Sequence, residues 1–113
     1  MEFACKRIDL DEVVKCSLGL TKAEYRVFRK YMALKKEITL AELSKKTGLD
    51  RTTVQKASLK LVGKGLLFRS QRNRPRGGYE FLYSIADRSE IRSKVRGIVR
   101  SWWEAVDENL QYW

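Results

Sequence analysis

The chain has 113 residues, of which 43% are apolar, 24 are basic, 14 are acidic and none is histidine. This length suits one domain with a modest core, and no apolar run approaches the roughly 18 residues that a membrane span requires. Two cysteines without histidine cannot supply the four ligands of a structural zinc site. A metal site and a membrane protein are therefore not expected.

Catalytic motifs are also missing. The chain has neither a G-x-S-x-G nor a G-x-x-x-x-G-K-[ST] pattern, and it lacks the side chain best suited to proton exchange near neutral pH. We expect no catalytic residues, no enzymatic activity and no cofactor. The N-terminus does not have the pattern of a signal peptide, so a cytoplasmic, nucleoid-associated location is the default expectation. Cys5 and Cys16 are expected to be free thiols, and their oxidation could still modulate the protein.

The first half of the chain predicts four helices. Residues 8–20 form a short amphipathic pattern that ends at Gly19, and Thr21 with Glu24 forms a capping box that begins a helix ending near Leu34. Ile38 predicts a single strand contact. A second capping box, Thr39 with Glu42, begins a short helix that ends at Gly48, and Asp50 is the N-cap of a helix that ends near residues 62–64.

The last two of these helices, joined by a turn that contains Gly48, predict a helix-turn-helix. Residues 66–70 predict a strand, residues 71–78 a basic loop, and residues 79–85 a second strand, which together form a hairpin. From Arg88 to Trp113 two adjacent apolar stripes predict one long helix. The fold class is thus mainly α with a small β-hairpin.

Positive charge is concentrated in the recognition part of this arrangement. The 29 residues between Asp50 and Glu80 contain eight basic side chains and no acidic one, whereas the rest of the chain has a net charge of only +2 out of +10. A run of charge often only solvates a surface. Because this run coincides with a helix and a glycine-containing hairpin, it also suits the binding of phosphate backbones and base edges.

The order of elements resembles the winged helix-turn-helix regulators of the MarR and TrmB-like type, which are common among prokaryotes and particularly archaea. The characteristic stretch is ITLAELSKKTGLDRTTVQKASLKLVGKGLL, residues 38–67. One departure is Ser58, at a position that is usually a large aliphatic residue in the family; the helix could be rotated slightly there, or Leu59 could pack against a neighbouring element. The resemblance implies a homodimeric transcription factor that places its third helix in the major groove and its wing on the backbone or minor groove.

Within the third helix, Val54, Ala57 and Leu61 are expected in the core. The expected outward side chains are Arg51, Thr52, Thr53, Gln55, Lys56, Ser58 and Lys60. Arginine can pair with guanine and glutamine with adenine, so Arg51, Thr52, Gln55 and Lys56 are the candidates for base contacts. Thr53 could instead cap its own helix. In the wing, we expect Arg72, Arg74 and Arg76 to point to one side and Arg69 to hold a phosphate.

The terminal helix is the candidate dimer interface. Ile91, Val95, Ile98 and Trp102 can cover the chain's own body, which leaves Val99, Trp103, Val106 and Leu110 for a second subunit, with help from Leu10 and Val14. Trp102, with its large aromatic side chain, is also counted among the interface candidates. We expect residues 1–87 to form the DNA-binding domain, with recognition helix near 50–63 and wing near 66–85, and residues 88–113 to form a dimerisation helix in the same compact unit.

Two functions remain open at this point. The first is a sequence-specific regulator whose partners are double-stranded DNA and a second copy of the chain. The alternative is a winged-helix module that docks on another protein of the transcription or replication machinery and binds nucleic acid without sequence preference. The sequence does not define the operator, the regulated genes, the direction of regulation or a small-molecule effector.

Overall fold

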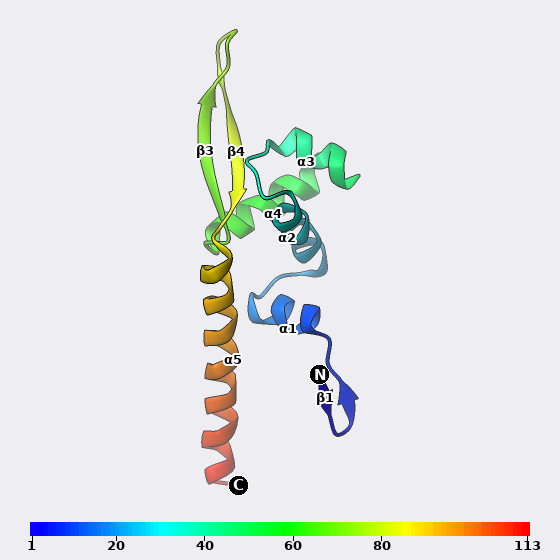
Figure 1. Ribbon diagram of the computed structural model, residues 1–113, viewed down its shortest axis with the longest axis vertical. Helices are drawn as coiled ribbons and strands as arrows, with labels where there is room; N and C mark the ends of the chain where they lie inside the picture. The colour runs from blue at the N-terminus through cyan, green and yellow to red at the C-terminus, as the bar shows by residue number, and fades with distance from the viewer. The chain divides into compact units, whose positions relative to one another are not determined.

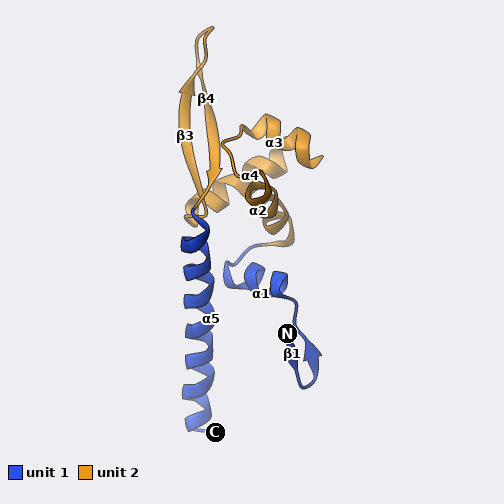
Figure 2. Ribbon diagram, viewed as in Figure 1, with its two compact units in different colours: residues 1–20, 87–113 blue, residues 21–86 orange.

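The structure is a computed structural model that describes all 113 residues, and it contains five helices and two antiparallel strand pairs (Figure 1). The chain divides into two compact units. Residues 1–20 and 87–113 form the first unit, and residues 21–86 form the second (Figure 2). The expectation that residues 1–87 and 88–113 have separate functional roles stays a prediction. No helix combines the length and the apolar content needed to cross a lipid bilayer.

The second unit contains the predicted helix-turn-helix and hairpin. Its elements are α2 (Lys22–Leu34), α3 (Leu40–Thr47), α4 (Arg51–Gly63), β3 (Leu67–Asn73) and β4 (Tyr79–Ile85). The core side chains of this unit that are essentially inaccessible to solvent include Val27, Phe28, Tyr31, Ile38, Leu43, Val54, Leu61, Leu66 and Leu67. Burying each large apolar side chain contributes about 1.5–3 kcal/mol, so this core holds α2, α3 and α4 together.

Side-chain caps begin the helices of this unit. The Thr21 amide donates to Glu24 Oε1 at 2.9 Å and the Glu24 amide donates to Thr21 Oγ1 at 3.1 Å, which confirms the first capping box. The second box is only half formed. The Glu42 amide donates to Thr39 Oγ1 at 3.2 Å, but Glu42 accepts from the Thr39 hydroxyl rather than from its backbone.

The turn between α3 and α4 is fixed by three local hydrogen bonds. Gly48 adopts a left-handed conformation with φ of 72°, and its amide donates to the Ser44 carbonyl at 3.0 Å. The Ser44 hydroxyl donates to the Leu49 carbonyl at 2.7 Å, and the Leu49 amide donates to Thr47 Oγ1 at 3.2 Å. A rigid turn of this kind sets the direction in which α4 leaves α3, and so it orients the helix expected to meet DNA.

The wing is longer and more regular than the sequence suggested. Strands β3 and β4 pair along their whole lengths, from Leu67 opposite Ile85 to Asn73 opposite Tyr79. Residues 71–73 therefore belong to β3, and the predicted loop of residues 71–78 was wrong over these three positions. The predicted strand contact at Ile38 is confirmed, because Ile38 and Tyr83 exchange both backbone hydrogen bonds, at 3.0 and 2.8 Å.

The first unit combines the two ends of the chain. Strands β1 (Glu2–Phe3) and β2 (Lys6–Arg7) form a short hairpin, followed by α1 (Leu10–Ser17), and α5 (Arg88–Gln111) is the long helix predicted from the apolar stripes. Helix α1 is shorter at both ends than the expected residues 8–20. Asp9 is its N-cap and accepts from the Asp11 amide at 3.2 Å. Cys5 and Cys16 are both free and exposed.

Ser58 does not face outward as the sequence suggested. It is fully buried in α4, and its hydroxyl lies 2.6 Å from the phenolic oxygen of Tyr31 in α2. Leu59, by contrast, is 45% exposed and is not packed away. The helix is therefore not rotated to bring Leu59 inward; instead, Ser58 itself faces the core and its hydroxyl is paired with Tyr31.

Candidate nucleic-acid interface

Helix α4 divides into a buried and an exposed face. Val54, Ala57 and Leu61 are buried, as predicted. The candidates that are exposed on the opposite side are Arg51, Thr52, Gln55, Lys56 and Lys60. Three of these five side chains are basic and the other two can both donate and accept hydrogen bonds, so this face offers the chemistry that DNA backbones and base edges accept. Base contacts by these residues stay a prediction.

Thr53 is the exception in this set, because it is half-buried and serves the helix cap. Its amide donates to Asp50 Oδ1 at 3.1 Å. Hydrogen bonds from the Thr53 hydroxyl and amide lower the pKa of the Asp50 carboxyl, with a smaller contribution from the charge of Lys56. Thr53 therefore fits the alternative in which it caps its own helix, and a contact with DNA would have to compete with that cap.

One face of the wing is aromatic. Arg69 lies over the ring of Phe81, with its guanidinium carbon 4.5 Å from the ring centre, and Phe81 meets Tyr79 edge to face at 5.5 Å between ring centres. A cation over an aromatic face is attracted by the ring quadrupole. Arg69 is still exposed, so its charge remains available at the base of the hairpin while Phe81 restricts its position.

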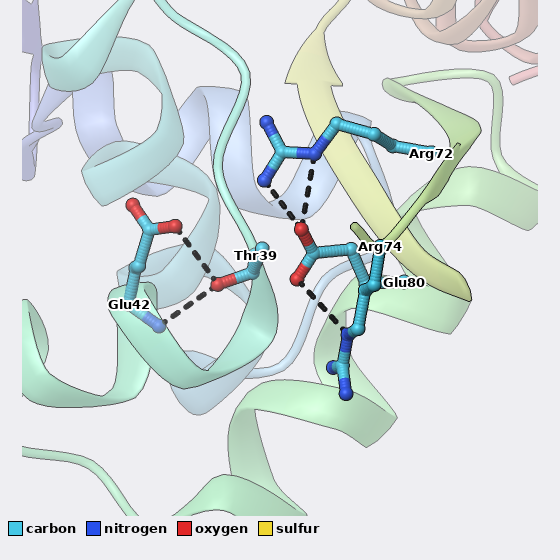
Figure 3. A network of polar contacts seen from close by, with 5 residues as sticks. All are labelled: Thr39, Glu42, Arg72, Arg74 and Glu80. Carbon is cyan, nitrogen blue, oxygen red and sulfur yellow. Dashed lines mark hydrogen bonds and ion pairs between the residues drawn. The ribbon is translucent and has the colours of Figure 1, made fainter. Parts of the chain in front are cut away.

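The other face of the wing is ionic. Arg72 lies directly opposite Glu80 in the strand register, and its Nε donates to Glu80 Oε1 at 3.0 Å while its Nη2 donates to the same oxygen (Figure 3). Arg74 Nε lies 3.7 Å from Glu80 Oε2. Two arginines thus converge on one carboxylate. The expectation that both project to the same side agrees with this geometry, but their charges are partly neutralised within the wing.

This ionic group stays charged over a wide pH range. The hydrogen bond and charge of Glu80 raise the pKa of Arg72, and the side chain of Arg72 holds the pKa of Glu80 below its usual value. Glu42 and Glu37 add smaller contributions at Arg72. Arg72 therefore lies in acidic surroundings, with Glu80 as its nearest carboxylate.

Arg76 occupies the tip of the wing. The tip is a turn in which the Gly77 amide donates to the Arg74 carbonyl at 3.1 Å, with Pro75 in the second position and Arg76 in the third. Gly77 and Gly78 both have positive φ values, of 95° and 76°, which return the chain to β4. Arg76 forms no ion pair in the structure, and so it is the wing arginine most readily available to a phosphate.

The helix and the wing meet in one cleft. Arg51 of α4, Arg74 of the turn and Glu80 of β4 line a cleft of about 370 Å³, together with the first residues of α3 and the aromatic face of β4. Residues predicted separately for base and phosphate contacts are thereby brought together. Sequence reasoning missed Glu80, since an acidic residue attracts no attention in a basic segment unless the strand register is known.

The candidate dimer residues on α5 are largely uncovered. The large apolar side chains of α5 from Ile98 onward are 39–63% exposed: Ile98, Val99, Trp102, Trp103, Val106 and Leu110. Ile91 is buried as expected, and Ile98 and Trp102 are exposed although they line a groove with residues of α1, so their role in covering the chain's own body stays a prediction. Leu10 is exposed and Val14 is half-buried. Within the first unit, Phe3, Val13, Cys16, Val99 and Trp102 are among the residues that line a groove of about 440 Å³.

Comparisons with known proteins agree with this fold. The chain is similar over its whole length to a possible transcriptional regulator from Methanosarcina mazei, with 38% identity, a TM-score of 0.91 and coverage of 95% of that chain. The ST1889 protein of Sulfolobus tokodaii is 26% identical, with a TM-score of 0.71. That match covers 84% of this chain and 92% of the ST1889 chain. The protein MJ1082 of Methanocaldococcus jannaschii is 28% identical over 107 residues, which is 95% of this chain and 88% of that protein.

The MarR relationship is also visible. Sco5413, a MarR family regulator from Streptomyces coelicolor, is 26% identical and has a TM-score of 0.51. The match covers 92% of this chain and 68% of the Sco5413 chain. The family model described as sugar-specific transcriptional regulator TrmB matches residues 14–89, a range that contains all of α2, α3, α4 and the wing. The Methanosarcina mazei protein, Sco5413 and the family model all carry the description of a transcriptional regulator and not of an enzyme, in agreement with the sequence prediction. The chain belongs to the TrmB family of winged-helix transcriptional regulators.

Proposed function

We propose that the protein is a sequence-specific regulator that binds double-stranded DNA as a homodimer. The observation that carries this proposal is the cleft between α4 and the wing, because it combines Arg51 from the helix with Arg74 from the hairpin. A helix that enters the major groove and a wing that follows the backbone would need charged groups at this junction. The exposed face of α4, with Thr52, Gln55 and Lys56, supplies candidates for base contacts.

The homodimer follows from two considerations. A single recognition helix reads few base pairs, whereas two helices related by a twofold axis read half-sites about 34 Å apart and add their contacts on one duplex. The exposed apolar side chains of α5 offer a surface that a second copy could cover, and aromatic residues such as Trp102 and Trp103 are typical interface anchors. Action on the chromosome in the cytoplasm is part of the same proposal.

The test is selection of bound fragments from genomic DNA, followed by footprinting of the recovered site. We expect protection of two related half-sites separated by about one helical turn. Binding to all duplexes with equal affinity would contradict sequence-specific regulation.

The same apolar α5 surface also suits the second candidate function, a docking module for another protein. Recovery of one stoichiometric protein partner after nuclease treatment, without any protected site, would favour that alternative.

A further inference from the structure

The wing contains an acidic residue where only basic residues were expected to matter. Glu80 lies at the centre of the ionic face, and its two oxygens approach different arginines: Oε1 accepts from Arg72 at 3.0 Å and Oε2 lies 3.7 Å from Arg74 (Figure 3). Two cations and one anion leave a net charge of +1 on this group. The guanidinium groups counted as phosphate contacts are therefore already engaged by a carboxylate in the free protein.

The location of this carboxylate matters as much as its charge. Glu80 lines the same cleft as Arg51 and Arg74, and its side chain is 22% exposed, so solvent and ligands can still reach it. Guanidinium groups bind carboxylates and phosphates through the same planar, charge-assisted hydrogen bonds. A backbone phosphate that approached Arg74 in this cleft would thus compete for donors that Glu80 now occupies.

We propose that the Glu80 carboxylate competes with DNA for the wing arginines. In the free protein this carboxylate occupies the position that a backbone phosphate takes on the wing. This inference rests on the proposed DNA-binding function. The two contacts differ in strength, because Arg72 donates twice to one oxygen whereas Arg74 has only a longer ion pair. Of the two arginines held by Glu80, Arg74 is accordingly the one that DNA recruits first, and Arg72 stays with Glu80.

The arrangement gives the wing a defined role in selectivity. Each phosphate that the protein neutralises steepens the slope of log affinity against log salt concentration by about one unit, whatever the base sequence. By holding back Arg72 and weakening Arg74, Glu80 lowers the affinity for arbitrary duplexes. The exposed side chains of α4 then account for a larger share of the total binding energy, and Glu80 is a specificity-determining residue although it is not expected to touch a base.

The experiment is the salt dependence of binding to a duplex of mixed sequence, measured for the wild type and for Glu80→Gln. The substitution keeps the shape of the side chain but removes its charge. We expect the slope of log affinity against log salt to steepen by about one unit and affinity at physiological salt to rise roughly fivefold, as one added phosphate contact would produce. Thermal unfolding checks that the wing remains folded.

Two variants serve as matched controls. Glu37→Gln makes the same change in net charge at a residue that acts on Arg72 only through weaker, longer-range electrostatics, so its slope should stay close to that of the wild type. Glu80→Asp keeps the charge on a shorter side chain and should have a slope closer to that of the wild type than Glu80→Gln has. If Glu80→Gln binds like the wild type or more weakly, or if Glu37→Gln produces an equal increase, the competitor role is wrong. Failure of the wild type itself to bind duplexes at low salt would instead refute the proposed function.

Discussion

The phenolic oxygen of Tyr31 lies 2.6 Å from the hydroxyl oxygen of Ser58, and this buried hydrogen bond joins α2 to α4. Both side chains are essentially inaccessible to solvent. The bond satisfies two polar groups that would otherwise be buried without a partner, and it fixes the position of the helix that carries the candidate base contacts. Its energetic role is directly testable.

We expect Tyr31→Phe and Ser58→Ala each to lower the free energy of unfolding by about 1–3 kcal/mol, because each leaves one buried hydroxyl without a partner. The double variant should lose much less than the sum of the two single losses, since neither hydroxyl then remains. Urea unfolding of the four proteins gives the coupling energy. Additive losses would show that the two hydroxyls do not depend on each other.

The same pair predicts a loss of stability in alkaline solution. Burial raises the pKa of Tyr31 from 10.0 to about 12, an effect that the hydrogen bond between Tyr31 and Ser58 only partly offsets. A tyrosine whose pKa is higher in the folded protein stabilises the fold fully at pH values below its pKa in the unfolded chain. Above that pH the unfolded chain ionises first, so this contribution to stability is lost as the pH rises through the folded-state pKa. We expect the wild type to lose stability between about pH 10 and pH 12 more steeply than Tyr31→Phe does. Parallel curves from urea unfolding at several pH values would contradict this.

Specificity is expected to reside in α4. Arg51→Ala and Gln55→Ala should each weaken binding to the preferred site by about 1–3 kcal/mol and have little effect on duplexes of mixed sequence, because base-edge contacts discriminate and phosphate contacts do not. Competition binding with the two kinds of duplex measures the difference. Arg92→Ala on α5 makes the same charge change outside the candidate interface. Equal weakening on both duplexes would assign Arg51 and Gln55 to the phosphate backbone.

Dimerisation is expected to depend on α5. Trp103 and Val106 are both exposed in the single chain, and burial of each such side chain contributes about 1.5–3 kcal/mol. Trp103→Glu combined with Val106→Glu should therefore convert a dimer to a monomer and reduce DNA affinity, as mass measurement in solution and binding assays would reveal. Arg92→Glu with Arg96→Glu adds acid at polar positions of the same helix and should leave the dimer intact. A monomeric wild type at micromolar concentration would refute the assignment.

Local signals predicted most of the fold. The Thr21 capping box, the turn at Gly48 and the strand at residues 79–85 depend on residues that are neighbours in the chain. They could therefore be predicted from the sequence, and the structure has elements at these places. Pairs that are distant in the chain leave no such pattern. Tyr31 and Ser58 are 27 residues apart, and the contact between them only becomes evident once α2 lies against α4.

The candidate site shows the same limit. Basic residues of α4 and the wing could be selected from charge and helical spacing alone, but their unequal environments could not. Arg69 lies on Phe81 and Arg72 is paired with Glu80 because of the strand register, which depends on where the turn at Pro75 begins. The hairpin formed by β1 and β2 has strands of only two residues each, too short for alternation to predict.

The register of the wing also restricts how such a hairpin can change. Arg69, Phe81 and Tyr79 share one face of the β3–β4 ribbon, and Arg72 and Glu80 share the other. Because successive side chains of a strand alternate between faces, inserting one residue between Arg69 and Arg72 would exchange the faces of β3 beyond that point and place Arg72 on the aromatic face, away from Glu80. Wings that differ in length while retaining both faces should therefore differ by two residues in each strand, and the tip carrying Arg76 would move outward in steps of about 7 Å.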